Sequence, residues 1–114
     1  MSTNYDRYAA ALPLASFYIL VAVERRPLYA YAIQEQIRHD SDGAVAPGRS
    51  SVDNAIKRLE SWGFIAPDAA SSYQDSRRGV SYTLTQAGQT RLKHEIAHLE
   101  RAVRIGNRTI SASS

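Results

Sequence analysis

The chain has 114 residues, with 14 Lys and Arg against 11 Asp and Glu for a formal net charge of +3, and it contains no cysteine. This length suits one domain with a modest core, to which a partner subunit would add buried surface. The lack of cysteine excludes disulfides, thiolate metal sites and a cysteine nucleophile, and favours a cytoplasmic location. The slight positive charge is compatible with a polyanionic partner.

The first clear element is an apolar helix that follows a polar arm, residues 1–11. The apolar run 14–23 is about half of the ~20 residues that a membrane span requires, so it predicts a buried helix and no membrane contact. Pro13 suits the first turn of this helix, and Pro27 stops it after about Arg26. Because the helix has no polar side, we expect either the other helices of the chain or, more readily, a second subunit to cover it.

A second helix is predicted for residues 29–39, because Ala30, Ile33 and Ile37 recur at helical spacing. Pro27 and Leu28 are expected to open it. A loop over residues 40–48 follows.

The third helix, residues 50–62, is amphipathic. Ser50 or Ser51 is expected to cap its first turn, and Gly63 to end it. Its apolar stripe consists of Val52, Ala55, Ile56 and Leu59. The opposite face is centred on Ser50, Asn54, Lys57 and Ser61. This arrangement predicts that the apolar stripe docks on a core while the polar face stays accessible.

The chemistry of that polar face suits DNA. Asn54 can pair with adenine through its amide, and Lys57 can donate to guanine or phosphate. Ser50, Ser51 and the helix N-terminus suit phosphate. Taken alone, the face is better explained as the solvated side of an ordinary helix. Its position between a turn and a basic hairpin favours DNA contact. The full set of expected DNA contacts comprises Arg49, Ser50, Ser51, Asp53, Asn54, Lys57, Arg58, Arg77, Arg78 and Tyr82.

A hairpin is predicted after the third helix, from two short alternating segments around a loop. The loop, about residues 71–81, carries Arg77 and Arg78, which suit phosphate contact or insertion into the minor groove. A chance pair of charges on a surface loop is the simpler alternative.

A fourth helix is predicted for residues 86–105, with Thr85 as its cap. Leu92, Ile96, Leu99 and Val103 recur at the a/d spacing of a coiled-coil seam. We expect this seam to pack on the first helix of a second subunit. The expected dimer interface comprises Leu14, Phe17, Tyr18, Val21, Leu92, Ile96, Leu99 and Val103. The remaining residues, 106–114, are small and polar and are expected to be disordered.

Residues 94–98 match H-E-x-x-H, the zinc-protease helix motif. A third protein ligand is required, and the short segment after His98 offers only Glu100 as an acid. The motif also falls on the packing seam at Ile96. We therefore expect no metal, no cofactor and no catalytic residues, with adventitious or interfacial metal binding as a minor alternative.

Aromatic residues are compatible with a pocket for a small aromatic effector, although core packing is their more common role. They comprise Tyr18, Tyr29, Tyr31, Trp62, Tyr73 and Tyr82.

Three stretches resemble the PadR family of bacterial transcription regulators: YILVAVERRPLYAYAI, AIKRLESWGFI and RRGVSYTLTQAGQTRL. The resemblance implies a winged helix-turn-helix homodimer that represses promoters, with the last helix packed on the partner's first helix. Asp53 stands where the family usually has tyrosine, and Tyr29-Ala30 replaces the usual His-Gly. An acid at position 53 disfavours phosphate but can accept from cytosine. The single helix after the wing is typical of the compact subtype.

The sequence thus predicts a mainly α fold with a small β-hairpin wing. It comprises an arm (1–11), a winged helix-turn-helix domain (12–85), a dimerisation helix (86–105) and a disordered tail (106–114). The predicted function is a non-enzymatic, DNA-binding regulator, a repressor that binds a pseudo-palindromic operator in double-stranded DNA as a homodimer. A winged-helix module for protein interaction or ligand sensing, with weak or no DNA binding, is the alternative.

Overall fold

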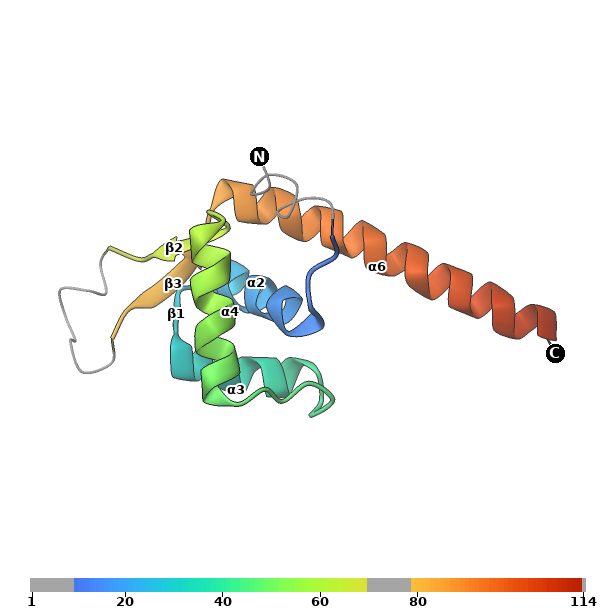
Figure 1. The fold of residues 1–114 in the computed structure, drawn as a ribbon, viewed down its shortest axis with the longest axis horizontal. Coiled ribbons are helices and arrows are strands. Elements are labelled where there is room, and N and C mark those ends of the chain that lie inside the picture. The colour runs from blue at the N-terminus through green and yellow to red at the C-terminus, as the bar shows by residue number, and fades with distance from the viewer. Residues whose placement is uncertain (1–9, 70–78, 114) are drawn as a thin grey trace.

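The computed structural model describes residues 10–69 and 79–113. The described chain consists of helices and short strands (Figure 1). Their order is α2 (Leu14–Arg25), β1 (Leu28–Tyr29), α3 (Ala30–Asp40), α4 (Arg49–Ser61), β2 (Ile65–Pro67), β3 (Ser81–Leu84) and α6 (Gln86–Ser113). This arrangement confirms the predicted fold class, mainly helical with a small antiparallel sheet.

The sheet has three antiparallel strands in the order β1-β3-β2. The hairpin of β2 and β3 was expected, but β1 was not. Leu28 pairs with Tyr82 across the sheet, so the prediction that Pro27 and Leu28 open the second helix is wrong. That helix begins at Ala30. A two-residue strand is too short to show the alternation that marks a strand in sequence.

The core forms around α2, which contacts α3, α4, α6 and β3. Figure 1 shows α2 enclosed between these elements. Ile19, Leu20, Ala22 and Val23 are buried, whereas Leu14 is 48% exposed. The chain alone therefore covers only part of this apolar helix.

Helix α4 begins at Arg49, after an N-cap at Gly48 that makes no side-chain hydrogen bond. The prediction that Ser50 or Ser51 caps this helix is therefore wrong, because both lie inside its first turn. Its end is as expected: Gly63 takes a φ of +83°, a left-handed conformation that glycine tolerates best.

The end of α4, strand β3 and the start of α6 meet at Thr85. The Thr85 hydroxyl accepts a hydrogen bond from the Gly88 N–H at 3.0 Å, as the predicted cap requires, and donates to the Gly63 carbonyl at 2.6 Å. The Thr85 N–H donates to the Phe64 carbonyl at 3.1 Å. A Cβ on Gly88 would lie 2.0 Å from that same carbonyl oxygen. Only glycine allows α6 to approach this closely.

An ion pair between Arg91 and Glu95 lies buried on α6, and sequence reasoning missed it. Their side chains are 1% and 2% exposed, and Arg91 Nη2 lies 3.0 Å from Glu95 Oε1. Glu95 also accepts from the Leu12 N–H at 3.1 Å, and Arg91 donates to the Ala10 carbonyl. The pair thus holds the segment before α2 against α6.

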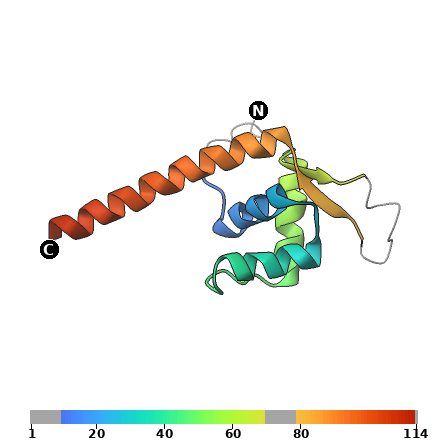
Figure 2. The ribbon, with the colours of Figure 1, turned by 180° about the vertical axis from the view of Figure 1, so that it is seen from behind.

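Helix α6 continues to Ser113, so the predicted disorder of residues 106–113 is wrong. The predicted helix ended just before Gly106, yet a single interior glycine costs a helix only about 1 kcal/mol relative to alanine. No proline follows it. Figure 2 shows the distal part of α6 projecting beyond the other elements. Its side chains from residue 101 to 113 are all exposed.

Gly88→Ala should destabilise the protein strongly, because the new methyl group would overlap the Phe64 carbonyl and the Leu84 side chain. We expect a loss of about 3 kcal/mol, the upper end of ordinary overpacking costs. Denaturant unfolding at fixed protein concentration measures it. The matched control is Gly106→Ala, where nothing lies within 4 Å and α6 should gain up to about 1 kcal/mol. Equal effects of the two changes would contradict the proposed close contact.

Glu95→Gln should cost about 3–5 kcal/mol, because it leaves the Arg91 charge buried without its counter-ion. Glu35→Gln, at a side chain that is 66% exposed, provides the control and should change stability by less than about 0.5 kcal/mol. Replacing both partners, Arg91→Met with Glu95→Leu, should recover most of the loss. A Glu95→Gln protein as stable as the wild type in thermal and denaturant unfolding would show that the pair does not hold the structure together.

Candidate nucleic-acid interface

Helix α4 presents a polar face to solvent, in the register that the sequence predicted. Its apolar stripe is buried, and consists of Val52, Ala55, Ile56 and Leu59. The opposite residues are exposed, and comprise Ser50, Ser51, Asn54, Lys57 and Arg58. Amide, hydroxyl and ammonium groups along an open helix face can hydrogen-bond to base edges and phosphates.

The N-terminus of α4 is open as well. Because no side chain in the described part of the chain caps it, the first-turn N–H groups are left for an outside acceptor. The helix macrodipole adds partial positive charge at the same end. These two features together favour an anion such as a phosphate.

Arg49 and Asp53 form an exposed ion pair at this end of α4. The Arg49 Nε donates to Asp53 Oδ1 at 3.1 Å, and the two side chains are 54% and 46% exposed. The sequence placed both residues at the interface but did not pair them, although an i, i+4 spacing of opposite charges is a recognisable signal.

Tyr82 on β3 lies beside the same flank of α4. Burial raises the pKa of its phenol, and the carboxylates of Glu60 and Asp53 raise that pKa further. The hydroxyl therefore stays protonated around neutral pH and remains a hydrogen-bond donor. This places one wing residue close to the acidic flank of the helix.

The predicted wing tip falls outside the described part of the chain. Arg77 and Arg78, with residues 71–74 before them, belong to this segment. The structure defines its two supports, β2 and β3, which pair antiparallel with Ile65 opposite Leu84.

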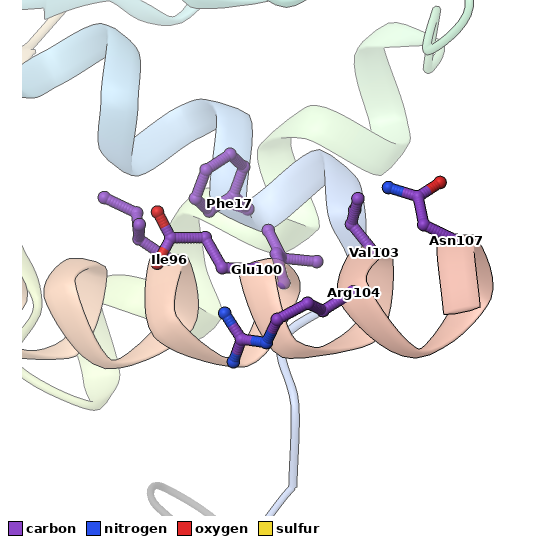
Figure 3. A pocket seen from close by; sticks show the side chains of 7 residues that line it. Phe17, Ile96, Glu100, Val103, Arg104 and Asn107 are labelled. Atoms are coloured by element: carbon purple, nitrogen blue, oxygen red, sulfur yellow. The ribbon is translucent and has the colours of Figure 1, made fainter.

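An apolar groove runs between α2 and α6 (Figure 3). It measures about 540 Å³ and is lined by Phe17, Ile96, Leu99, Glu100, Val103, Arg104 and Asn107. Phe17, Tyr18 and Val21 remain half-buried, whereas Leu92 is only 8% exposed and packs in the core of its own chain. The groove therefore contains Phe17, Ile96, Leu99 and Val103 of the predicted dimer interface, whereas Leu92 lies in the core of the single chain.

Among the described residues, the H-E-x-x-H motif belongs to no group of side chains that could hold a metal ion. Glu95 is committed to the buried pair with Arg91, while His94 and His98 are exposed on α6. Within residues 10–69 and 79–113, no group of three or more His, Cys, Asp or Glu side chains could hold a metal ion.

Several of the described aromatic residues pack in pairs. Trp62 meets Phe64 edge-on, with ring centroids 6.1 Å apart. Tyr29 stacks on Tyr31 at 6.3 Å. None of these four residues lines the groove between α2 and α6.

Comparison with known proteins gives matches of two kinds. Residues 19–94 match the transcriptional regulator PadR-like family. A transcriptional regulator from Clostridium thermocellum is 23% identical with a TM-score of 0.72, and the alignment covers 82% of this chain and 87% of that one. A PadR family transcription regulator from hypervirulent Clostridium difficile R20291 is 20% identical with a TM-score of 0.71, covering 86% and 99%.

The adhesin competence repressor of Streptococcus pyogenes is more distant. It is 16% identical with a TM-score of 0.58, and the alignment covers 91% of this chain and 68% of that one. Curated proteins give no match. These solved structures show that the fold is that of winged-helix regulators. No helix in the described ranges is long and apolar enough to cross a membrane.

Proposed function

This chain belongs to the PadR-like family of transcriptional regulators, and we propose that it is a cytoplasmic repressor that binds a pseudo-palindromic operator as a homodimer. The observation that carries the proposal is the open polar face of α4, which lies opposite a buried apolar stripe and beside a small sheet. Family members are regulators rather than enzymes, and no catalytic step is assigned to any residue.

In the proposed complex, the first turns of α4 enter the major groove. Asn54 pairs with adenine, and Lys57 donates to guanine or to phosphate. The first-turn N–H groups and the Ser50 and Ser51 hydroxyls receive a phosphate. Arg58 and Tyr82 contact the backbone on either side of the helix. Arg77 and Arg78 of the wing bind phosphate or enter the minor groove.

Exposed apolar surface on α2 and α6 supports the homodimer. Leu14, Ile96 and Val103 are between 40% and 61% exposed in the single chain. Such side chains beside an apolar groove mark an interaction surface. In the proposed dimer, α6 of one subunit packs on α2 of its partner. To reach successive major grooves, the two α4 helices of this dimer must lie about 34 Å apart.

A second candidate is a winged-helix module for protein interaction or ligand sensing, with weak or no DNA binding. The half-exposed Asp53 on the proposed reading helix favours it, since a carboxylate near phosphates is repulsive. In this second candidate, where no partner helix covers the groove between α2 and α6, that groove could take a small aromatic effector.

Asn54→Ala and Lys57→Ala should both weaken binding to DNA from the region upstream of the protein's own gene. Loss of a good base contact costs about 1–3 kcal/mol. If Lys57 binds phosphate, its removal should also reduce the slope of log affinity against log salt by about 1. Fluorescence anisotropy at several salt concentrations measures both quantities.

Lys93→Ala, an exposed lysine on α6, is the matched control and should bind as the wild type does. Wild-type protein that shows no affinity for this DNA or for genomic fragments would favour the interaction module instead.

Val103→Glu should dissociate the dimer, because it places a charge on the apolar seam of α6. Sedimentation at micromolar concentration should show a dimer for the wild type and a monomer for the variant. Ala97→Glu adds the same side chain on the outer face of α6 and should leave the dimer intact. A stable wild-type monomer at this concentration would refute the proposed assembly.

A further inference from the structure

We propose that Arg49 determines DNA sequence specificity by reading a guanine, and that Asp53 positions its guanidinium for this contact. The inference rests on the DNA binding proposed above and adds the base that is read and the residue that reads it.

The terminal nitrogens of the Arg49 guanidinium are available for contact with a base. Arg49 is the first residue of α4, the part of a recognition helix that reaches base edges. Its Nε is engaged by Asp53 Oδ1. Its two terminal nitrogens make no hydrogen bond or ion pair with any residue that the structure describes. Two parallel N–H donors on a planar group match the O6 and N7 acceptors of guanine.

A gain in folding stability does not explain why Arg49 and Asp53 are paired. A cation in the first turn of a helix opposes the macrodipole. An exposed ion pair contributes little to folding, with a median near zero. What the pair does achieve is to restrict the long Arg49 side chain before DNA arrives. A side chain held in its bound orientation loses less conformational freedom on binding, which favours the correct contact.

The charges around Arg49 also favour its contact with a base over a contact with a phosphate. Asp53 offsets the Arg49 charge, and Glu60 lies on the same flank near Tyr82. This flank of α4 therefore attracts the uniformly charged DNA backbone weakly. Arg49, paired with Asp53, binds DNA most tightly where both guanine acceptors are present and Asp53 lies away from the phosphates. The pair should thus contribute to discrimination between sequences more than to overall affinity.

The test is selection of binding sites from randomised DNA duplexes, followed by affinity measurements on each single-base variant of the selected site. The wild type should select a site with a guanine at one symmetric position in each half. Arg49→Lys keeps the charge but loses the two parallel N–H donors of the guanidinium. It should reduce the preference for that guanine by about 10- to 100-fold while leaving affinity for unrelated DNA unchanged.

Asp53→Asn should lower the same preference by a smaller factor, on the order of 3- to 10-fold. It should also bind unrelated DNA more tightly, because a negative charge is removed. Arg38→Lys is the matched control, since Arg38 pairs with Glu35 on α3 in a similarly exposed ion pair. Thermal unfolding confirms that each variant is folded.

Three results would overturn the inference while leaving DNA binding in place. In the first, Arg49→Lys keeps the guanine preference within twofold. In the second, Arg49→Lys weakens all sequences equally, which would make Arg49 a phosphate contact. In the third, only Asp53→Asn alters the selected base, which would make Asp53 a reader of cytosine. A wild type that selects no sequence would instead refute the proposed function, and this inference with it.

Discussion

The close contact of Gly88 with the Phe64 carbonyl is the constraint on which the rest of the structure depends. The residue after α4, the strand β3 and the first turn of α6 share one set of hydrogen bonds at Thr85. A side chain at position 88 would separate α6 from this junction. The angle at which α6 leaves the domain and the position of the wing relative to α4 are therefore set together. In a dimer built through α6, that angle fixes the spacing of the two reading helices.

A buried charge pair controls the other side of α6. Burying Arg91 and Glu95 costs desolvation, and such pairs are often no more stable than apolar replacements. Their hydrogen bonds to the backbone of Ala10 and Leu12 give the pair a different role, which is to fix where the chain enters α2. The Arg91 guanidinium also lies over the Phe64 ring, 5.8 Å from its centroid. The pair and the Thr85 junction thus meet at Phe64, and both brace α6 against α2 and α4.

Much of the fold could be predicted from the sequence because its signals are local. The 3–4 spacing of apolar residues predicted the two faces of α4, and Thr85 marked the start of α6. The features that were missed depend on contacts distant in sequence. Strand β1 exists only because β3 lies beside it, and Glu95 looks like a surface residue until Leu12 and Arg91 surround it. The residues of the candidate site stay a prediction, and the i, i+4 spacing of Arg49 and Asp53 was a local signal for their pairing that was not used.

The pairing with Arg49 changes how the charge of Asp53 on α4 is interpreted. Seen alone, Asp53 is an acid on a helix that should meet phosphates, and it argues against DNA binding. Paired with Arg49 it adds no net charge, because the two charges offset each other at 3.1 Å. The positive charge on the open face of α4 then rests on Lys57 and Arg58. In the proposed complex, overall affinity and sequence discrimination therefore come from different side chains of one helix: Lys57 and Arg58, which pair with no described residue, attract the DNA backbone, whereas Arg49, held by Asp53, discriminates between sequences.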